Sequence, residues 1–169
     1  PISAFLPSLG VSGLVISYAN TNVLYALTGD GDSFISGGLV YGFGYHRPSM
    51  GVYKSTDGGA SWQPTGSFEI DGIWVGYKLI QHPSNANTLF AATSKGIYRT
   101  LNGGATWEQV LQRGFCDDIE FHPTNANILY TSGDNNVVSY STDGGSNWQN
   151  STYTTSFPSN ADRIEIAVS

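Results

Sequence analysis

The side chains best suited to chemistry gather in one glycine-rich segment, residues 29–50. This segment offers carboxylates, aromatic rings, an imidazole and a guanidinium group, carried by Asp30, Asp32, Tyr41, Tyr45, His46 and Arg47. Aromatic rings beside charged groups suit stacking on a sugar ring or contact with a protein surface. The alternative is a flap that packs over its own scaffold or a neighbouring domain. Both interpretations remain open from the residues alone.

The same segment contains the one candidate metal site. Asp30 and Asp32 alternate with glycines, and carboxylate and carbonyl oxygens are the ligands that Ca²⁺ prefers. The run lacks the further positions of an EF-hand loop, so a turn with solvated acids is the favoured interpretation, and no other cofactor is expected. His82 and His122 each precede a proline at equivalent places, which predicts turn residues and not zinc ligands.

Two other groups of acids were weighed as site residues. Glu69 and Asp71 lie between the first two repeats described below and are candidates for a ligand face. Asp117 and Asp118 are neighbours on a predicted strand, possible lining of a central channel. Adjacent strand residues point to opposite faces of a sheet, so these two carboxylates do not by themselves form an acid/base pair.

Charge and hydropathy exclude two classes of partner. The chain has 13 acids against 7 scattered bases, a net charge of −6, so nothing gathers the cations needed to neutralise a nucleic-acid backbone. No apolar run approaches the roughly 18 residues of a membrane-spanning helix. The single cysteine, Cys116, excludes an internal disulfide and is expected to be buried as a small apolar side chain.

The elements that must position these residues are set by an internal repeat. Three segments align at residues 51–62, 96–107 and 137–148, and each ends in Gly-Gly-x-x-Trp. An Asn-x-Asn turn precedes each of them, at residues 20–22, 85–87 and 125–127. Each repeat reads as four short strands. Units of four strands with a period of about 40–45 residues are typical of β-propeller blades.

The sequence therefore predicts an all-β fold. We expect blade 1 at about residues 11–66, blade 2 at about 73–112, blade 3 at about 115–152 and the first strand of a fourth blade at about 161–169. Propellers have roughly four to eight blades, so three blades and a strand cannot close a ring. We expect a larger propeller of seven or more blades, completed by the rest of its own chain or by another copy.

The tryptophan motif resembles the Asp-box, or bacterial neuraminidase repeat, Ser/Thr-x-Asp-x-Gly-x-x-Trp. Its positions are Ser55, Asp57, Gly59 and Trp62; Thr100, Asn102, Gly104 and Trp107; and Ser141, Asp143, Gly145 and Trp148. A short carboxylate in a hairpin can accept the loop's own N–H groups. The motif is therefore interpreted as a fastener of the fold. The resemblance places it between the third and fourth strands of a blade, opposite the usual ligand face.

Nearly the whole sequence resembles secreted Asp-box propellers of Bacteroidetes-type bacteria, within a superfamily of sialidase, xyloglucanase and sortilin-like propellers. The resemblance implies a secreted or outer-surface location, with type IX export as an analogy. It implies a glycan, a surface protein or a secretion-system protein as partner. The leading hypothesis is a non-enzymatic binding, scaffold or adhesion module.

The alternative hypothesis is a xyloglucanase-like glycoside hydrolase with two carboxylates. Asp30 follows the second strand of its blade, a place comparable to that of one catalytic acid in such enzymes, and its partner would lie outside this sequence. A sialidase is disfavoured because the arginines are few and scattered. A photosystem assembly factor or a sortilin-like receptor shares only the Asp-box with this sequence.

Overall fold

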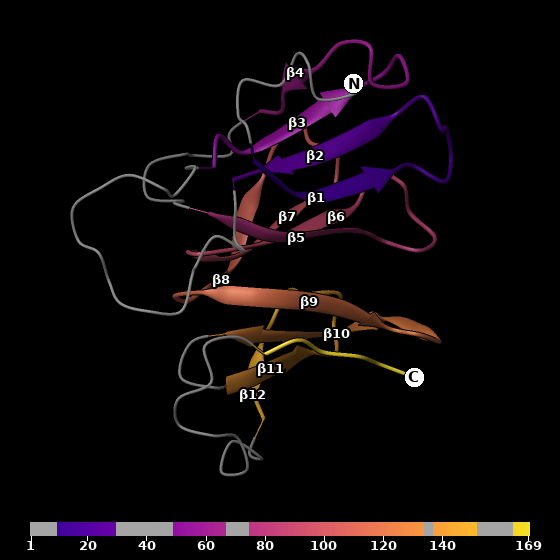
Figure 1. The fold of residues 1–169 in the computed structure, drawn as a ribbon. Coiled ribbons are helices and arrows are strands. Elements are labelled where there is room, and N and C mark those ends of the chain that lie inside the picture. The colour runs from indigo at the N-terminus through magenta and orange to yellow at the C-terminus, as the bar shows by residue number, and fades with distance from the viewer. Residues whose placement is uncertain (1–9, 30–48, 67–74, 134–136, 152–163) are drawn as a thin grey trace, which may run out of the picture.

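The computed structural model describes residues 10–29, 49–66, 75–133, 137–151 and 164–169. Within these ranges the secondary structure is entirely β and forms three antiparallel sheets of four strands each. Each sheet is one sequence repeat, with its strands in chain order (Figure 1). The all-β expectation and the four strands per repeat are confirmed.

The strands of the first sheet are β1 (Val11–Ile16), β2 (Leu24–Thr28), β3 (Val52–Ser55) and β4 (Gln63–Pro64). The second sheet contains β5 (Gly76–Gln81), β6 (Leu89–Thr93), β7 (Gly96–Thr100) and β8 (Glu108–Gln112). The third contains β9 (Cys116–His122), β10 (Asn125–Gly133), β11 (Val137–Ser141) and β12 (Gln149–Asn150).

The second strand of a sheet lies in the middle of the fold. Every residue of β2 and of β6 is buried. Both faces of these strands are covered, which is why they read as continuous apolar runs and not as an alternation of apolar and polar residues. Among the fourth strands, β4 and β12 are two residues long and exposed, as suits an outer edge, whereas β8 is five residues long and partly buried.

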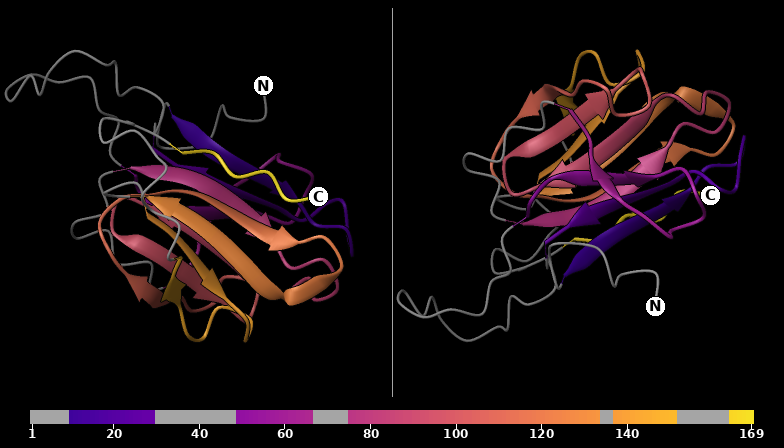
Figure 2. Two further views of the ribbon diagram at one scale, coloured as in Figure 1. Left: turned by 90° about the horizontal axis from the view of Figure 1, so that it is seen from below. Right: turned by 90° about the horizontal axis from the view of Figure 1, so that it is seen from above.

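The sheets stack face to face around their first strands, with β1, β5 and β9 side by side along the inner edge (Figures 1 and 2). One apolar cluster joins the first two sheets, with Leu79 of β5 among Tyr25, Leu27 and Val52. A second apolar cluster joins the second and third sheets, with Ile119 of β9 packed with Phe90 and other residues of the second sheet. The three sheets are thus successive blades of a β-propeller.

The third blade differs from expectation only at its strand ends. The inner strand begins at Cys116, where residue 115 was expected, and the second strand extends over Asn125–Gly133 because it continues through the Asn-x-Asn turn. Cys116 itself is fully buried, as predicted. Such shifts arise because turn residues that tolerate bends can also pair when the neighbouring strand is long enough.

The segment 164–169, expected to begin a fourth blade, lies against the third one without joining a strand ladder. The backbone N–H of Ile166 donates to Oδ2 of Asp118 at 2.7 Å, and the Ser132 hydroxyl donates to the carbonyl of Ile164. Asp118 and Ser132 are opposite each other on β9 and β10, so the segment runs over the inner part of this blade (Figure 2).

Candidate functional site

Residues 29–50 make up most of the connection between β2 and β3, and the structure describes the strand ends on either side of it. The hydroxyl of Thr28 donates to the carbonyl of Gly51 at 2.8 Å and accepts the N–H of Met50 at 2.7 Å. In the second blade, Thr93 does the same with Gly96 at 2.8 Å and Lys95 at 3.1 Å.

The second blade joins the equivalent strands through Ser94 and Lys95 alone, and the two blades hold these strand ends with the same threonine contacts. At Gly29 the backbone has a φ of +101° and donates to the carbonyl of Gly10 at 3.1 Å. A Cβ there would lie 3.0 Å from the amide nitrogen of Gly76. The first blade therefore carries its insertion on the same rigid base that elsewhere holds a two-residue turn.

The residues predicted to line a ligand face lie outside the described ranges. They are Asp30, Asp32, Tyr41, Tyr45, His46, Arg47, Glu69 and Asp71. The structure thus describes the strand ends on either side of the segment that contains the first six in the sequence, and the roles of all eight stay predictions. Within the described ranges, no group of three or more His, Cys, Asp or Glu side chains is arranged to hold a metal ion.

The Asp-box loops lie at the opposite end of the blades. Ser55 pairs with Leu24 at the start of β2, whereas the insertion leaves from the end of β2, so the β3–β4 hairpin is on the other face. In this hairpin Oδ1 of Asp57 accepts the Ser55 hydroxyl at 2.7 Å and the Ser61 N–H at 2.9 Å. Oγ of Ser55 in turn accepts the N–H of Gly59 at 2.8 Å.

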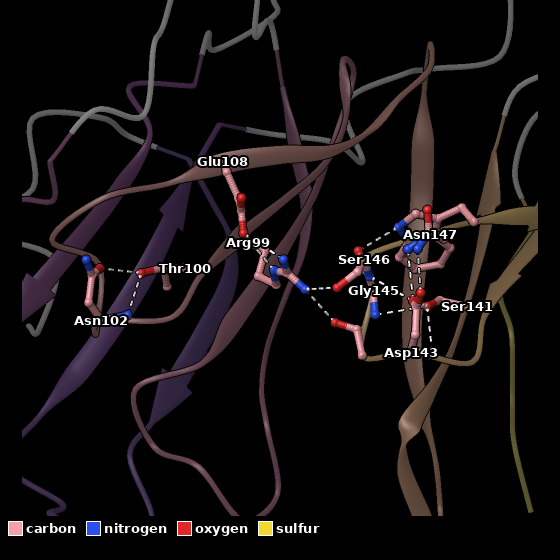
Figure 3. Close-up of polar contacts among 11 residues, drawn as sticks. Arg99, Thr100, Asn102, Glu108, Ser141, Asp143, Gly145, Ser146 and Asn147 are labelled. Atoms are coloured by element: carbon pink, nitrogen blue, oxygen red, sulfur yellow. Dashed lines mark hydrogen bonds and ion pairs between the residues drawn. The ribbon is translucent and has the colours of Figure 1, made fainter.

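The other two loops repeat this arrangement. Asp143 accepts the Ser141 hydroxyl at 2.8 Å and the Asn147 N–H at 2.8 Å. In the second loop the amide oxygen of Asn102 takes the place of the carboxylate and accepts the Thr100 hydroxyl at 2.9 Å (Figure 3). It also accepts the Thr106 N–H at 2.9 Å. These hydrogen bonds of the Ser or Thr and the Asp or Asn side chains of the motif therefore stay within their own hairpins.

As a result, the pKa values of the two loop carboxylates are lower than usual. Hydrogen bonds from the Ser61 hydroxyl and N–H, and then from Ser55, lower the pKa of Asp57 from 3.8 to about 2. Hydrogen bonds from the side chain and N–H of Asn147, and then from Ser141, lower the pKa of Asp143 to about 2 as well. Both groups stay ionised in mild acid, so neither is suited to donate a proton at neutral pH.

These lowered pKa values predict that the folded state loses stability as the pH falls from 3.8 towards 2. A carboxylate whose pKa falls on folding stabilises the native state fully above 3.8, and this contribution is lost as the pH falls towards 2. Urea midpoints measured from pH 5 to pH 2 should fall in this window. The double variant Asp57→Asn/Asp143→Asn should show a smaller fall, and an equal fall in both proteins would contradict the assignment.

In the second Asp-box loop, where Asn102 takes the place of the aspartate, introducing a carboxylate is expected to stabilise the fold. Asn102→Asp restores a carboxylate that can accept the Thr106 N–H with charge assistance, while the Thr106 hydroxyl turns to donate as Ser61 does to Asp57. We expect the melting temperature at pH 7 to rise by about 2 °C. Asp143→Asn is the matched control and should lower it. A drop on Asn102→Asp would show that the amide's donation to Thr106 matters more than the charge.

The hairpins also join neighbouring blades. Nζ of Lys54 in blade 1 donates to the carbonyl of Gly103 in the second Asp-box at 3.1 Å. The guanidinium of Arg99 in blade 2 donates to the carbonyl of Gly144 in the third at 2.8 Å and to the Ser146 hydroxyl at 3.0 Å (Figure 3). The second and third hairpins are thus each held by a cation of the blade before them.

An ion-pair cluster lies at the inner edge, where the sequence indicated no pairing. Nζ of Lys78 on β5 is 2.7 Å from Oδ1 of Asp118 and 2.5 Å from Oε1 of Glu120, both on β9. Burial alone would lower the pKa of Lys78, but the hydrogen bonds and charges of the two acids outweigh it and raise that pKa above 10.5. Asp118 is buried and also accepts the N–H of Ile166, so it joins blade 2 to the segment after blade 3.

The two histidines before prolines have equivalent surroundings. Nδ1 of His82 accepts the Ser84 N–H at 3.2 Å, and Nδ1 of His122 accepts the Thr124 N–H at 3.3 Å. Both are turn contacts, in line with the expectation from the sequence. No helix in the described ranges is long and apolar enough to cross a membrane.

Solved structures with the same fold include GH74 enzymes and YCF48. An ancestral GH74 enzyme matches at 26% identity with a TM-score of 0.61, over 86% of this chain and 19% of that enzyme. The GH74 enzyme of Niastella koreensis matches at 23% identity with a TM-score of 0.60, over 83% of this chain and 22% of that one. YCF48 from Cyanidioschyzon merolae matches at 16% identity with a TM-score of 0.55, over 86% and 38%.

The chain therefore spans about a fifth of the length of the GH74 proteins it matches. The likenesses below 25% identity establish the propeller fold and nothing further. Among curated proteins, no match was found. The family comparison reaches well beyond the Asp-box motif, so the likeness to sortilin-type propellers is broader than the motif alone indicated. The model of the Sortilin-Vps10 family (sortilin, neurotensin receptor 3) matches residues 50–162, more than half of the sequence, and the chain belongs to this family.

Proposed function

We propose that this chain is part of an exported or cell-surface β-propeller that binds a glycan or a protein and performs no catalysis. The observation that carries the proposal is the insertion at residues 29–50, seated on the threonine-held base that the second blade uses for a two-residue turn. Long insertions on a rigid scaffold are where binding residues are usually placed. The aromatic, arginine and carboxylate residues of this insertion supply the contacts.

The acids in the described ranges support a binding role. Asp57 and Asp143 are occupied within their hairpins, and Glu108 pairs with Arg99 at 2.7 Å. Asp118 and Glu120 pair with Lys78. A hydrolytic pair needs two carboxyl groups facing each other across a cleft, roughly 5–9.5 Å apart, one of which holds a proton near neutral pH. These five acids are engaged in contacts within the fold instead.

The second candidate is a glycoside hydrolase, favoured by the 26% identity to an ancestral GH74 enzyme. In that case Asp30, which follows β2 at the start of the insertion, supplies one carboxylate, and its partner comes from a part of the protein outside this sequence. A Ca²⁺ ion held by Asp30 and Asp32 is compatible with either function, as a support for the loop.

The experiment is a panel of plant and host glycans presented to the complete protein, with binding and release of reducing sugar measured in parallel. A grafted variant replaces residues 29–50 with Ser-Lys, the turn of Ser94 and Lys95, so that two residues join Thr28 to Gly51 as they join Thr93 to Gly96 in blade 2. Binding without hydrolysis, lost in the graft but kept in Lys95→Ala, supports the proposal. Hydrolysis that Asp30→Ala abolishes overturns it in favour of the second candidate, and glycan binding that survives the graft overturns the role of the insertion.

The complete protein can also be used to test whether the acids at the start of the insertion bind Ca²⁺. Ca²⁺ titrated into the complete protein by calorimetry should give heat that Asp32→Asn removes if the acids at the start of the insertion hold the ion. Absence of heat in the unaltered protein would show that these acids are solvated.

A further inference from the structure

When the inner strands of the three blades are aligned by their pairing register, one residue of the first blade differs from its equivalents in exposure. Leu14, Leu79 and Ile119 occupy equivalent places on the inner strands, facing Ala26, Ala91 and Thr131 in turn. Leu79 is 5% exposed and Ile119 is fully buried, because each packs against the blade before it. Leu14 is 51% exposed.

The residue two places further along the strand repeats the contrast. Phe121 of blade 3 packs edge-to-face on Phe90 of blade 2, with ring centroids 5.7 Å apart. Its equivalent in blade 1, Ile16, is 57% exposed. Blade 2 has the polar Gln81 at this place, so the second contrast is with blade 3 alone, whereas Leu14 differs from both Leu79 and Ile119. Two inward positions of β1 therefore carry large apolar side chains that are exposed.

The Asp-box hairpins show what lies on the other side of such an interface. The carbonyls of Gly103 and Gly144 each accept from a cation of the preceding blade, Lys54 or Arg99. That cation is, in both cases, the residue immediately before the Ser or Thr of its own Asp-box. The equivalent carbonyl of blade 1 belongs to Gly58, and no lysine or arginine in the described ranges donates to it.

Leu14, Ile16 and the carbonyl of Gly58 together form what we call the leading face. We propose that the leading face docks a further four-stranded Asp-box blade that is not among these 169 residues. Its third strand carries lysine or arginine directly before the Ser or Thr of its motif, and this cation binds the Gly58 carbonyl. The apolar side chains of its second strand cover Leu14 and Ile16, as Leu27 and Phe90 cover their counterparts.

A second copy of this chain does not provide such a blade. The free outer side of a copy is its third blade, where the residue before Ser141 is Tyr140, which lacks the positive charge and whose hydroxyl donates to Gln149 at 2.9 Å. The inner part of that side is already occupied by residues 164–166, held by Asp118 and Ser132. The occupant is therefore another blade of the same polypeptide, which agrees with the greater length of the GH74 neighbours.

The test introduces a charge at the leading face of the complete protein. Leu14→Asp should lower its melting temperature by about 5 °C or more, because the aspartate is buried at the new interface. Leu101→Asp is the matched control, a leucine that is 57% exposed at the tip of an Asp-box hairpin, and should leave the melting temperature within about 1 °C. In hydrogen exchange, the β1 amides of the complete protein should be protected to within about tenfold of those of β5.

Three results would overturn the proposal. The first is a complete protein in which Leu14→Asp is as harmless as Leu101→Asp and β1 exchanges rapidly. The second is a 169-residue chain that dimerises with concentration in sedimentation and loses the dimer on Leu14→Asp, which would make a second copy the occupant. The third is an equal loss of stability on Leu14→Asp in the monomeric 169-residue chain, which would mean that its own residues cover the face.

Discussion

Replacing Gly145 with alanine is expected to cost about 3 kcal/mol of folding free energy, because the added methyl group meets both backbone strain and the neighbouring blade. The backbone there has a φ of +79°, which a side chain opposes. A Cβ would also lie 2.6 Å from Cε1 and 3.1 Å from Cζ of Phe90 on the neighbouring blade. The Phe90 ring is buried and packed against Phe121, so it has no room to move away.

The adjacent glycine separates the two causes. Gly144 has a φ of +69°, and nothing lies within 4 Å of a Cβ placed on it. Gly144→Ala should therefore cost only the backbone part, about 1 kcal/mol. Urea unfolding of both variants measures the difference directly. Equal costs would mean that blade 3 can shift away from blade 2, and the close packing of this interface would be refuted.

Replacing Asp118 with asparagine is expected to cost about 2 kcal/mol. The carboxylate is buried and has three donors, namely Lys78 and the backbone N–H groups of Ile119 and Ile166. An amide keeps the shape but loses the charge, and it presents one acceptor oxygen and one NH₂ group to these donors. The ammonium of Lys78 is about one-third exposed and keeps Glu120, so the loss is less than for a fully buried pair.

Glu120→Gln is the matched control for this cluster. Glu120 binds the same ammonium at 2.5 Å but is about one-third exposed, so water can replace it and the expected cost is below about 1 kcal/mol. Hydrogen exchange adds a second readout, because Asp118→Asn should also loosen residues 164–169, which Asp118 holds. A larger cost for Glu120→Gln than for Asp118→Asn would show that the outer of the two ion pairs is the stabilising one.

Local patterns accounted for much of the fold. The Asp-box hairpins could be predicted because Ser55, Asp57 and Gly59 bond with one another or with residues a few places away. Such contacts depend on residues that are close in the sequence and on residue types that favour turns, and both can be read from the sequence. The four strands of each repeat followed from the same motifs, which mark where one strand ends and the next begins.

The inner-edge cluster could not be predicted in this way. Lys78 and Asp118 occupy equivalent places in successive repeats, so an alignment of the repeats superimposes them and hides that they touch. Strand geometry indicates only that Asp117 and Asp118 do not pair with each other as acid and base, whereas the cation that binds Asp118 comes from the preceding blade. Only the stacking of β5 against β9 brings the opposite charges together.

The sequence by itself determined the all-β class, the three repeats and the fastening role expected of the Asp-box residues, because these depend on neighbours within a hairpin. The tertiary structure decided which blade holds which hairpin, through Lys54 and Arg99, and where the inner ion pair forms. It also revealed that Leu14 and Ile16 are exposed, whereas Leu79 and Ile119 are buried and Phe121 packs on Phe90. These contacts join residues about 30 or more positions apart, and their partners are set by the order and spacing of whole sheets.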